Sequence, residues 1–117
     1  MEFSPQLQNQ LVQFEQVRQQ IQAVTSQRIQ MDSGLREING ALEELEKASK
    51  DTPIYKNTGS LFIKVKDVEE LKKELKESRE SLEVRISSLR KQEEQLKKRY
   101  ETLQESVTKA MANMQGS

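Results

Sequence analysis

Two series of apolar residues at seven-residue spacing, with a short stretch of β-forming residues between them, most constrain what this chain can fold into. Further apolar residues complete an alternating three- and four-residue spacing, which is the 3.5-residue period of a coiled coil. We therefore expect a mainly α fold, in which two long helices form an antiparallel coiled coil joined by one β-hairpin. Both chain ends then lie together, far from the strands. The first series is Leu7, Phe14, Ile21, Leu35 and Leu42, and the second is Val68, Leu75, Leu82, Leu89, Leu96 and Leu103.

Composition favours a coiled coil and argues against several other classes. Only 33% of the 117 residues are hydrophobic and the mean hydropathy is −0.86, which is too polar for a compact globular core. Lys and Arg together number 19, as do Asp and Glu, so the chain lacks the net charge that is typical of disordered proteins. The same balance argues against nucleic-acid binding, which needs clustered basic residues.

The whole chain, residues 1–117, is expected to form a single domain, with its first helix over about residues 5–50. Ser4 can accept a hydrogen bond from a free amide, and Pro5 loses nothing at the first helical position. The helix should end before Pro53, because a proline disfavours the α conformation of the residue before it.

Two glycines and one arginine are unfavourable residues within the expected first helix. Gly34 and Gly40 each cost about 1 kcal/mol relative to alanine, which favours a break. Leu35 and Leu42 nevertheless keep the heptad phase of the residues before them, so we expect one continuous helix with a soft region near Gly34. Arg28 occupies a position of the apolar series.

The N-terminal half is rich in glutamine. A prion-like tract is one interpretation, but glutamine is also a fair helix former, and the apolar seam persists beneath it. We therefore expect these side chains to solvate the outer face of the first helix. They are Gln6, Gln8, Gln10, Gln13, Gln16, Gln19, Gln20, Gln22, Gln27 and Gln30.

A β-hairpin is expected over about residues 53–65. Ile54–Asn57 and Leu61–Val65 are rich in β-branched and aromatic residues, and Thr58 and Gly59 between them supply a turn.

The hairpin has apolar side chains on both faces and two open edges. A lone two-stranded hairpin is marginal in water, so we expect it to pair between subunits. The alternative is a hairpin packed only on its own helices. The residues expected to carry the assembly are Ile54, Tyr55, Leu61, Phe62, Ile63 and Val65.

The second helix is expected over about residues 67–114. Asp67 and Glu70 match the spacing of a capping box, which places the helix start directly after the second strand. Ser78 and Glu93 are the weak points of its apolar seam.

No residue pattern in the sequence indicates an enzyme, a metal site or a cofactor. Histidine and cysteine are absent, and no glycine-rich phosphate loop is present. Carboxylates such as Glu93 and Glu94 are expected on the solvated face, where each has a lysine four residues further on, Lys97 and Lys98. Such exposed acids have nothing to tune the pKa of a catalytic group.

No apolar run approaches the roughly 20 residues that span a bilayer. The first residues, Met1–Pro5, lack the basic and apolar regions of a signal peptide. We therefore expect a cytoplasmic protein with no membrane partner.

The end of the coiled coil opposite the hairpin carries more apolar residues than its seam requires. Leu11, Val12 and Met111 lie off the main register, so we expect them to contact other polypeptides by apolar burial. Leu7, Phe14, Val107 and Met114 either share that role or simply close the seam. The full set at this tip is Phe3, Leu7, Leu11, Val12, Phe14, Val107, Ala110, Met111 and Met114.

Over nearly its whole length the chain resembles the β-type subunit of prefoldin. The most specific stretch is Ile54–Val65, supported by Leu82–Arg85 and Arg90–Glu93. A single hairpin indicates the β type, because the α type carries two.

The resemblance implies an ATP-independent chaperone with no cofactor. It implies a hexamer of two α-type and four β-type chains, whose hairpins build a β-barrel. Unfolded clients are then held at the coiled-coil tips and passed to a group II chaperonin. The alternative from the residues alone is a structural or tethering coiled coil, whose helices pair with partner helices.

Overall fold

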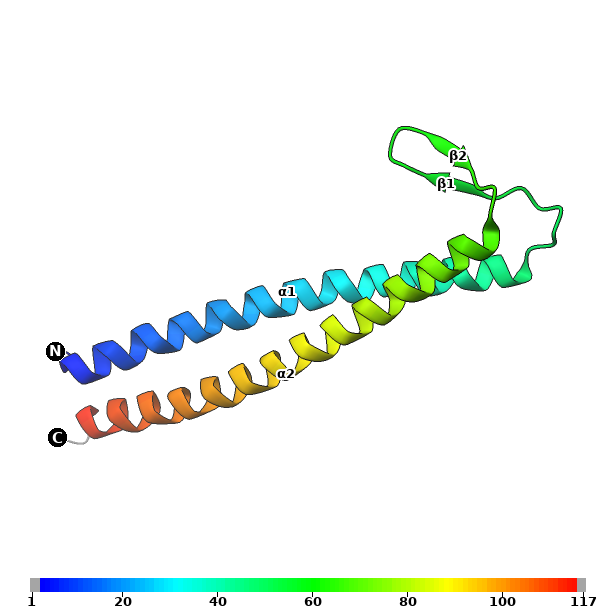
Figure 1. The fold of residues 1–117 in the computed structure, drawn as a ribbon. Coiled ribbons are helices and arrows are strands. Elements are labelled where there is room, and N and C mark those ends of the chain that lie inside the picture. Colours follow the sequence, from blue (N-terminus) through cyan, green and yellow to red (C-terminus); the bar gives the residue numbers. More distant parts are fainter. Residues whose placement is uncertain (1–2, 116–117) are drawn as a thin grey trace. The chain divides into compact units, whose positions relative to one another are not determined.

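The computed structural model describes residues 3–115, which form two long helices joined by one antiparallel hairpin (Figure 1). In chain order the elements are α1 (Pro5–Lys47), β1 (Tyr55–Asn57), β2 (Phe62–Lys64) and α2 (Val68–Gln115). The fold class expected from the sequence is confirmed.

The chain divides into two compact units, and each contains a segment of both helices. The terminal unit joins the described residues up to Ile29 with those from Ser87 onward, and the hairpin unit is Gln30–Ile86.

The helices run antiparallel within each unit. In the terminal unit Phe14 stacks on Tyr100, while Thr25, further along α1, meets the earlier Glu93 of α2.

The two helices also run antiparallel in the hairpin unit. Glu46 lies 3.7 Å from Lys72, and Gly34 lies beside the later residue Leu82.

Both helices begin at the caps that the sequence predicts. The Leu7 amide donates to Ser4 Oγ at 3.1 Å, and the Glu70 amide donates to Asp67 Oδ1 at 3.0 Å. Each bond satisfies an amide that has no partner within its own helix.

Helix α1 ends at Lys47 rather than near residue 50. Beyond it, the Thr52 amide donates to the Ser49 carbonyl at 3.1 Å, and the Ser49 amide donates to Thr52 Oγ1 at 3.2 Å. These bonds close a turn that takes the chain out of the helix, and Pro53 then prevents its resumption.

The hairpin turn depends on a glycine. Tyr55 pairs with Lys64 and Asn57 with Phe62. Gly59 has a φ of 91°, a left-handed conformation that side chains disfavour, and its amide donates to Asn57 Oδ1 at 3.0 Å. Thr58 closes the turn by donating its amide to the Leu61 carbonyl at 2.8 Å.

Among the described residues, the buried apolar side chains either belong to the two heptad series or lie three or four residues after a member of them, as the predicted seam requires. They are Leu7, Val17 and Leu89 in the terminal unit, and Leu42, Leu45 and Ile86 in the hairpin unit. Helix α1 continues through Gly34 and Gly40, as the heptad phase predicts.

One buried residue in the terminal unit is charged. The Glu93 side chain is only 5% exposed. It accepts a hydrogen bond from Arg28 Nε on one oxygen and one from Thr25 Oγ1, at 3.0 Å, on the other. The sequence predicts Glu93 both at a weak point of the apolar seam and on a solvated face. Its burial confirms the seam position and shows that the solvated-face prediction is wrong. Glu93 lies in the seam because Arg28, the interruption in the other helix, pairs with it.

Glu93 remains ionised despite its burial. Burial raises the pKa of the Glu93 carboxyl, but the hydrogen bonds from Arg28 and Thr25 and the positive charges of Arg28 and Lys97 outweigh that effect. Together they lower the pKa below its usual value of 4.5. Since the folded state favours the charged form, the pair stabilises the fold above about pH 4.5 and loses that contribution as pH falls through the lowered pKa.

We expect Glu93→Gln to destabilise the protein by about 1–3 kcal/mol near neutral pH, because a weaker acceptor then faces Arg28. Urea unfolding of both proteins at about pH 7 and about pH 3 measures the difference. It should shrink at the acidic pH, because below about pH 4.5 the unfolded chain binds a proton at Glu93 more readily than the folded protein does. Glu94→Gln is the exposed control and should differ little at either pH. A difference that stays constant with pH would show that the charge of Glu93 contributes nothing.

Gly40→Ala should stabilise the protein by about 0.5–1 kcal/mol, because alanine has the higher helix propensity. A Cβ atom at Gly40 would meet nothing within 4 Å. The same change at Gly59 should destabilise the hairpin, because its φ is 91°. Thermal unfolding followed by circular dichroism measures the first effect. A fall in the melting temperature of Gly40→Ala would show that α1 needs flexibility there.

Candidate functional site

The hairpin presents its apolar side chains to solvent. Phe62 is 74% exposed, and Tyr55, Leu61 and Ile63 are also more than half exposed. Of the six apolar residues that the sequence assigns to assembly, only Ile54 and Val65 are partly buried. The helices of the same unit therefore leave the strands uncovered, unlike the alternative in which the hairpin packs on its own helices.

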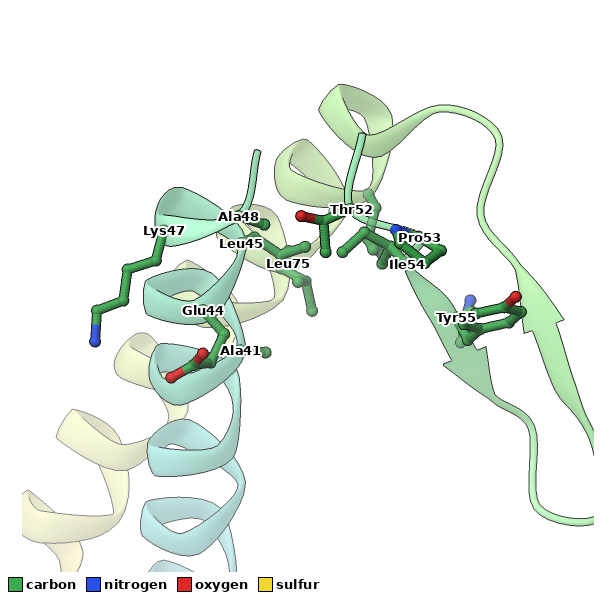
Figure 2. Close-up of a pocket in the computed structure, with 12 residues that line it drawn as sticks. Ala41, Glu44, Leu45, Lys47, Ala48, Thr52, Pro53, Ile54, Tyr55 and Leu75 are labelled. Carbon is green, nitrogen blue, oxygen red and sulfur yellow. The ribbon is translucent and has the colours of Figure 1, made fainter. Parts of the chain in front are cut away.

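A groove of about 590 Å³ lies beside the hairpin, within the hairpin unit. Figure 2 shows Leu45, Leu75, Pro53 and Ile54 around this space, with Tyr55 at its strand side. Sequence reasoning missed this groove. Its signal is a pair of small residues that leave room for it, Ala41 in the last turns of α1 and Ala48 directly after the end of that helix.

The predicted tip residues all lie in the terminal unit, where the first turns of α1 and the last turns of α2 are neighbours (Figure 1). Val12 is 55% exposed, Phe3 41% and Met111 40%. These three side chains are available to another molecule. The remaining members are partly buried, apart from the buried Leu7: Leu11, Phe14, Val107, Ala110 and Met114.

Two of the residues with undecided roles are packed within the coiled coil. Leu7 is only 2% exposed, so it closes the seam. Phe14 stacks on Tyr100 with ring centroids 4.6 Å apart. The accessible apolar surface of the tip therefore comes mainly from residues outside the main heptad register.

The first half of α1 carries little charge. Between residues 3 and 27, Glu15 and Arg18 are the only charged residues. They pair with each other, Arg18 Nε donating to Glu15 Oε2 at 2.9 Å, and this hydrogen bond lowers the pKa of the Glu15 carboxyl. The remaining polar surface of this segment is largely amide.

The described residues contain no cluster of three or more acidic, histidine or cysteine side chains that would hold a metal ion. Among the same residues, no helix is long and apolar enough to cross a membrane.

Comparison with known proteins identifies the family. A family model described as prefoldin subunit matches residues 8–113. The chain belongs to the prefoldin family. A prefoldin subunit beta from Archaeoglobus fulgidus is 41% identical over 115 residues, covering 98% of each chain. One from Methanococcoides burtonii is 46% identical over 110 residues, covering 94% of this chain and 93% of the relative.

A solved structure supports the same assignment. The prefoldin beta subunit from Thermococcus strain KS-1 matches with a TM-score of 0.79 and 35% identity, covering 93% of this chain and 95% of that one. The resemblance to a β-type prefoldin subunit is confirmed. Prefoldins are chaperones rather than enzymes, and this chain is a prefoldin chaperone subunit that assembles into a complex with other subunits.

Proposed function

We propose that this chain is the β-type subunit of a cytoplasmic hetero-hexamer of two α-type and four β-type chains. The complex holds non-native polypeptides at the coiled-coil tips without hydrolysing ATP, and passes them to a group II chaperonin. The observation that carries the client-holding proposal is the exposure of Phe3, Val12 and Met111 together in the terminal unit.

The hairpin supports the assembly proposal. Its strands have unpaired outer edges and apolar side chains on both faces, and Phe62 is the most exposed of its large apolar side chains. Pairing with the hairpins of neighbouring subunits into a β-barrel satisfies the edges and covers the side chains. The chaperonin step rests on membership of the family.

The tip has the chemistry that holding of unfolded chains requires. Non-native polypeptides expose apolar side chains, and burying them is worth about 25 cal/mol per Å². Met111 is flexible and polarizable, so it adapts to clients of different sequence. Phe3 and Val12 add a larger aromatic and a compact aliphatic surface.

Replacing Val12 and Met111 together by serine should weaken client holding about tenfold. Roughly half of each side chain is exposed, and serine loses the free energy of burying that half against a client. The measurement is light scattering as a chemically unfolded protein is diluted, without nucleotide, into the complex with an α-type partner. The complex concentration that gives half suppression of aggregation is compared between variants.

The matched control is Val84→Ser, since Val84 is 66% exposed but lies in the hairpin unit. It should leave holding unchanged. If the tip variant forms a complex of unchanged mass and suppresses aggregation as well as the unmodified complex does, the client-binding role of the tip is rejected. If even the unmodified complex fails to suppress aggregation, the chaperone proposal itself fails, and a structural coiled-coil role takes its place.

Replacing Phe62 and Ile63 by serine should abolish the hexamer while leaving both helices formed. Burial of such side chains is worth about 1.5–3 kcal/mol each, and all β-type subunits lose it at once. Native mass spectrometry with the α-type partner measures assembly, and circular dichroism measures helix content. Lys56→Ser, on the strand opposite Ile63, is the control. A variant that still assembles would show that the hairpin is not the assembly surface.

A further inference from the structure

The terminal unit contains a second surface, separate from the apolar tip. It is a shallow groove of about 480 Å³ between α1 and α2. This volume falls in the range of about 300–1,000 Å³ that accommodates small ligands and suits a short segment of polypeptide. The groove is lined by Gln20, Val24, Gln92, Gln95, Leu96 and Arg99.

Three of the lining side chains are amides with unused hydrogen-bonding capacity. Each glutamine offers two N–H donors and one carbonyl acceptor. Gln92 makes one long contact, 3.5 Å from its Nε2 to Ser88 Oγ. Gln20 and Gln95 make no side-chain hydrogen bond to another described residue, and both are exposed.

The base of the groove is apolar. Val24 and Leu96 are seam residues that remain partly exposed, because two helices alone cannot enclose them. A ligand in the groove therefore meets two apolar side chains together with amides from both helices. Arg99 supplies the one charged side chain of the lining.

We propose that this groove binds the main chain of an extended, non-native polypeptide through the amides of Gln20, Gln92 and Gln95. The inference rests on the proposed function and adds a second kind of client contact to it. Every residue other than proline carries one main-chain donor and one acceptor, whatever its side chain. An amide matches both groups, so binding is independent of client sequence.

Main-chain recognition also distinguishes non-native from native proteins. In a folded protein most peptide groups are already paired within helices and sheets, whereas an extended chain leaves them open. The helices of a second copy of this chain likewise have their peptide groups paired, so they cannot form the same hydrogen bonds with the glutamine side chains of the groove. The α1 residues of the lining, Gln20 and Val24, add no charge to that of Arg99.

The test compares two triple variants of the full chain in its complex with an α-type partner. One replaces Gln20, Gln92 and Gln95 by alanine. The matched control replaces three exposed glutamines of the same unit that do not line the groove: Gln22, Gln27 and Gln104. Both sets remove the same number of amides, and alanine maintains the helix in each.

The probe is a short fluorescein-labelled peptide of alternating serine and leucine, with a copy whose backbone amides are N-methylated. Fluorescence anisotropy measures its affinity for each complex. We expect the groove variant to bind the unmethylated peptide about tenfold more weakly than the control variant does, because three modest hydrogen bonds are lost. Methylation should weaken binding to the control variant and have little further effect on the groove variant.

Equal peptide affinity of the two variants would overturn the groove proposal. So would equal binding of the methylated and unmethylated peptides by the control variant, since the main chain is then not recognised. Aggregation suppression by the unmodified complex, measured in parallel, tests the chaperone function separately. A complex that suppresses aggregation while the two variants bind alike retains the proposed function and loses only the groove.

Discussion

The hydrogen bonds of buried Glu93 with partly buried Arg28 and Thr25 form a polar layer that fixes how the two helices of the terminal unit align. Apolar residues repeat every heptad, so a slip of one helix by seven residues still places apolar against apolar. The polar layer does not tolerate that slip, because it leaves the Glu93 carboxylate buried without its partners. The Phe14–Tyr100 stacking, the groove and the tip all depend on this alignment.

Most of the fold was predictable because its signals are local. The helix caps at Ser4 and Asp67 and the turn at Gly59 are each specified within a few residues, and the structure contains all three. The burial of Glu93 was not predictable in this way. A charged residue in a heptad series is interpreted as a weak point of the apolar seam unless a residue that pairs with it is identified. That partner lies 65 residues away, so it emerges only when the helices are aligned.

The functional surfaces show the same division between local and long-range information. Heptad position distinguished Leu11, Val12 and Met111 from the seam. Val12 and Met111 are exposed, whereas Leu11 is partly buried. Heptad position left Leu7 and Phe14 undecided, because at the end of a coiled coil a seam residue is covered only if the opposite helix extends that far. The two grooves depend on side chains from separate segments of the chain, which no single sequence window brings together.

The exposed hairpin gives the unassembled chain a property of its own. A newly made copy displays uncovered β strands and aromatic side chains, with Phe62 the most exposed. These are the features by which chaperones distinguish unfinished proteins from finished ones. Until it assembles with other subunits, the chain therefore exposes apolar side chains and strand edges of the kind that favour aggregation.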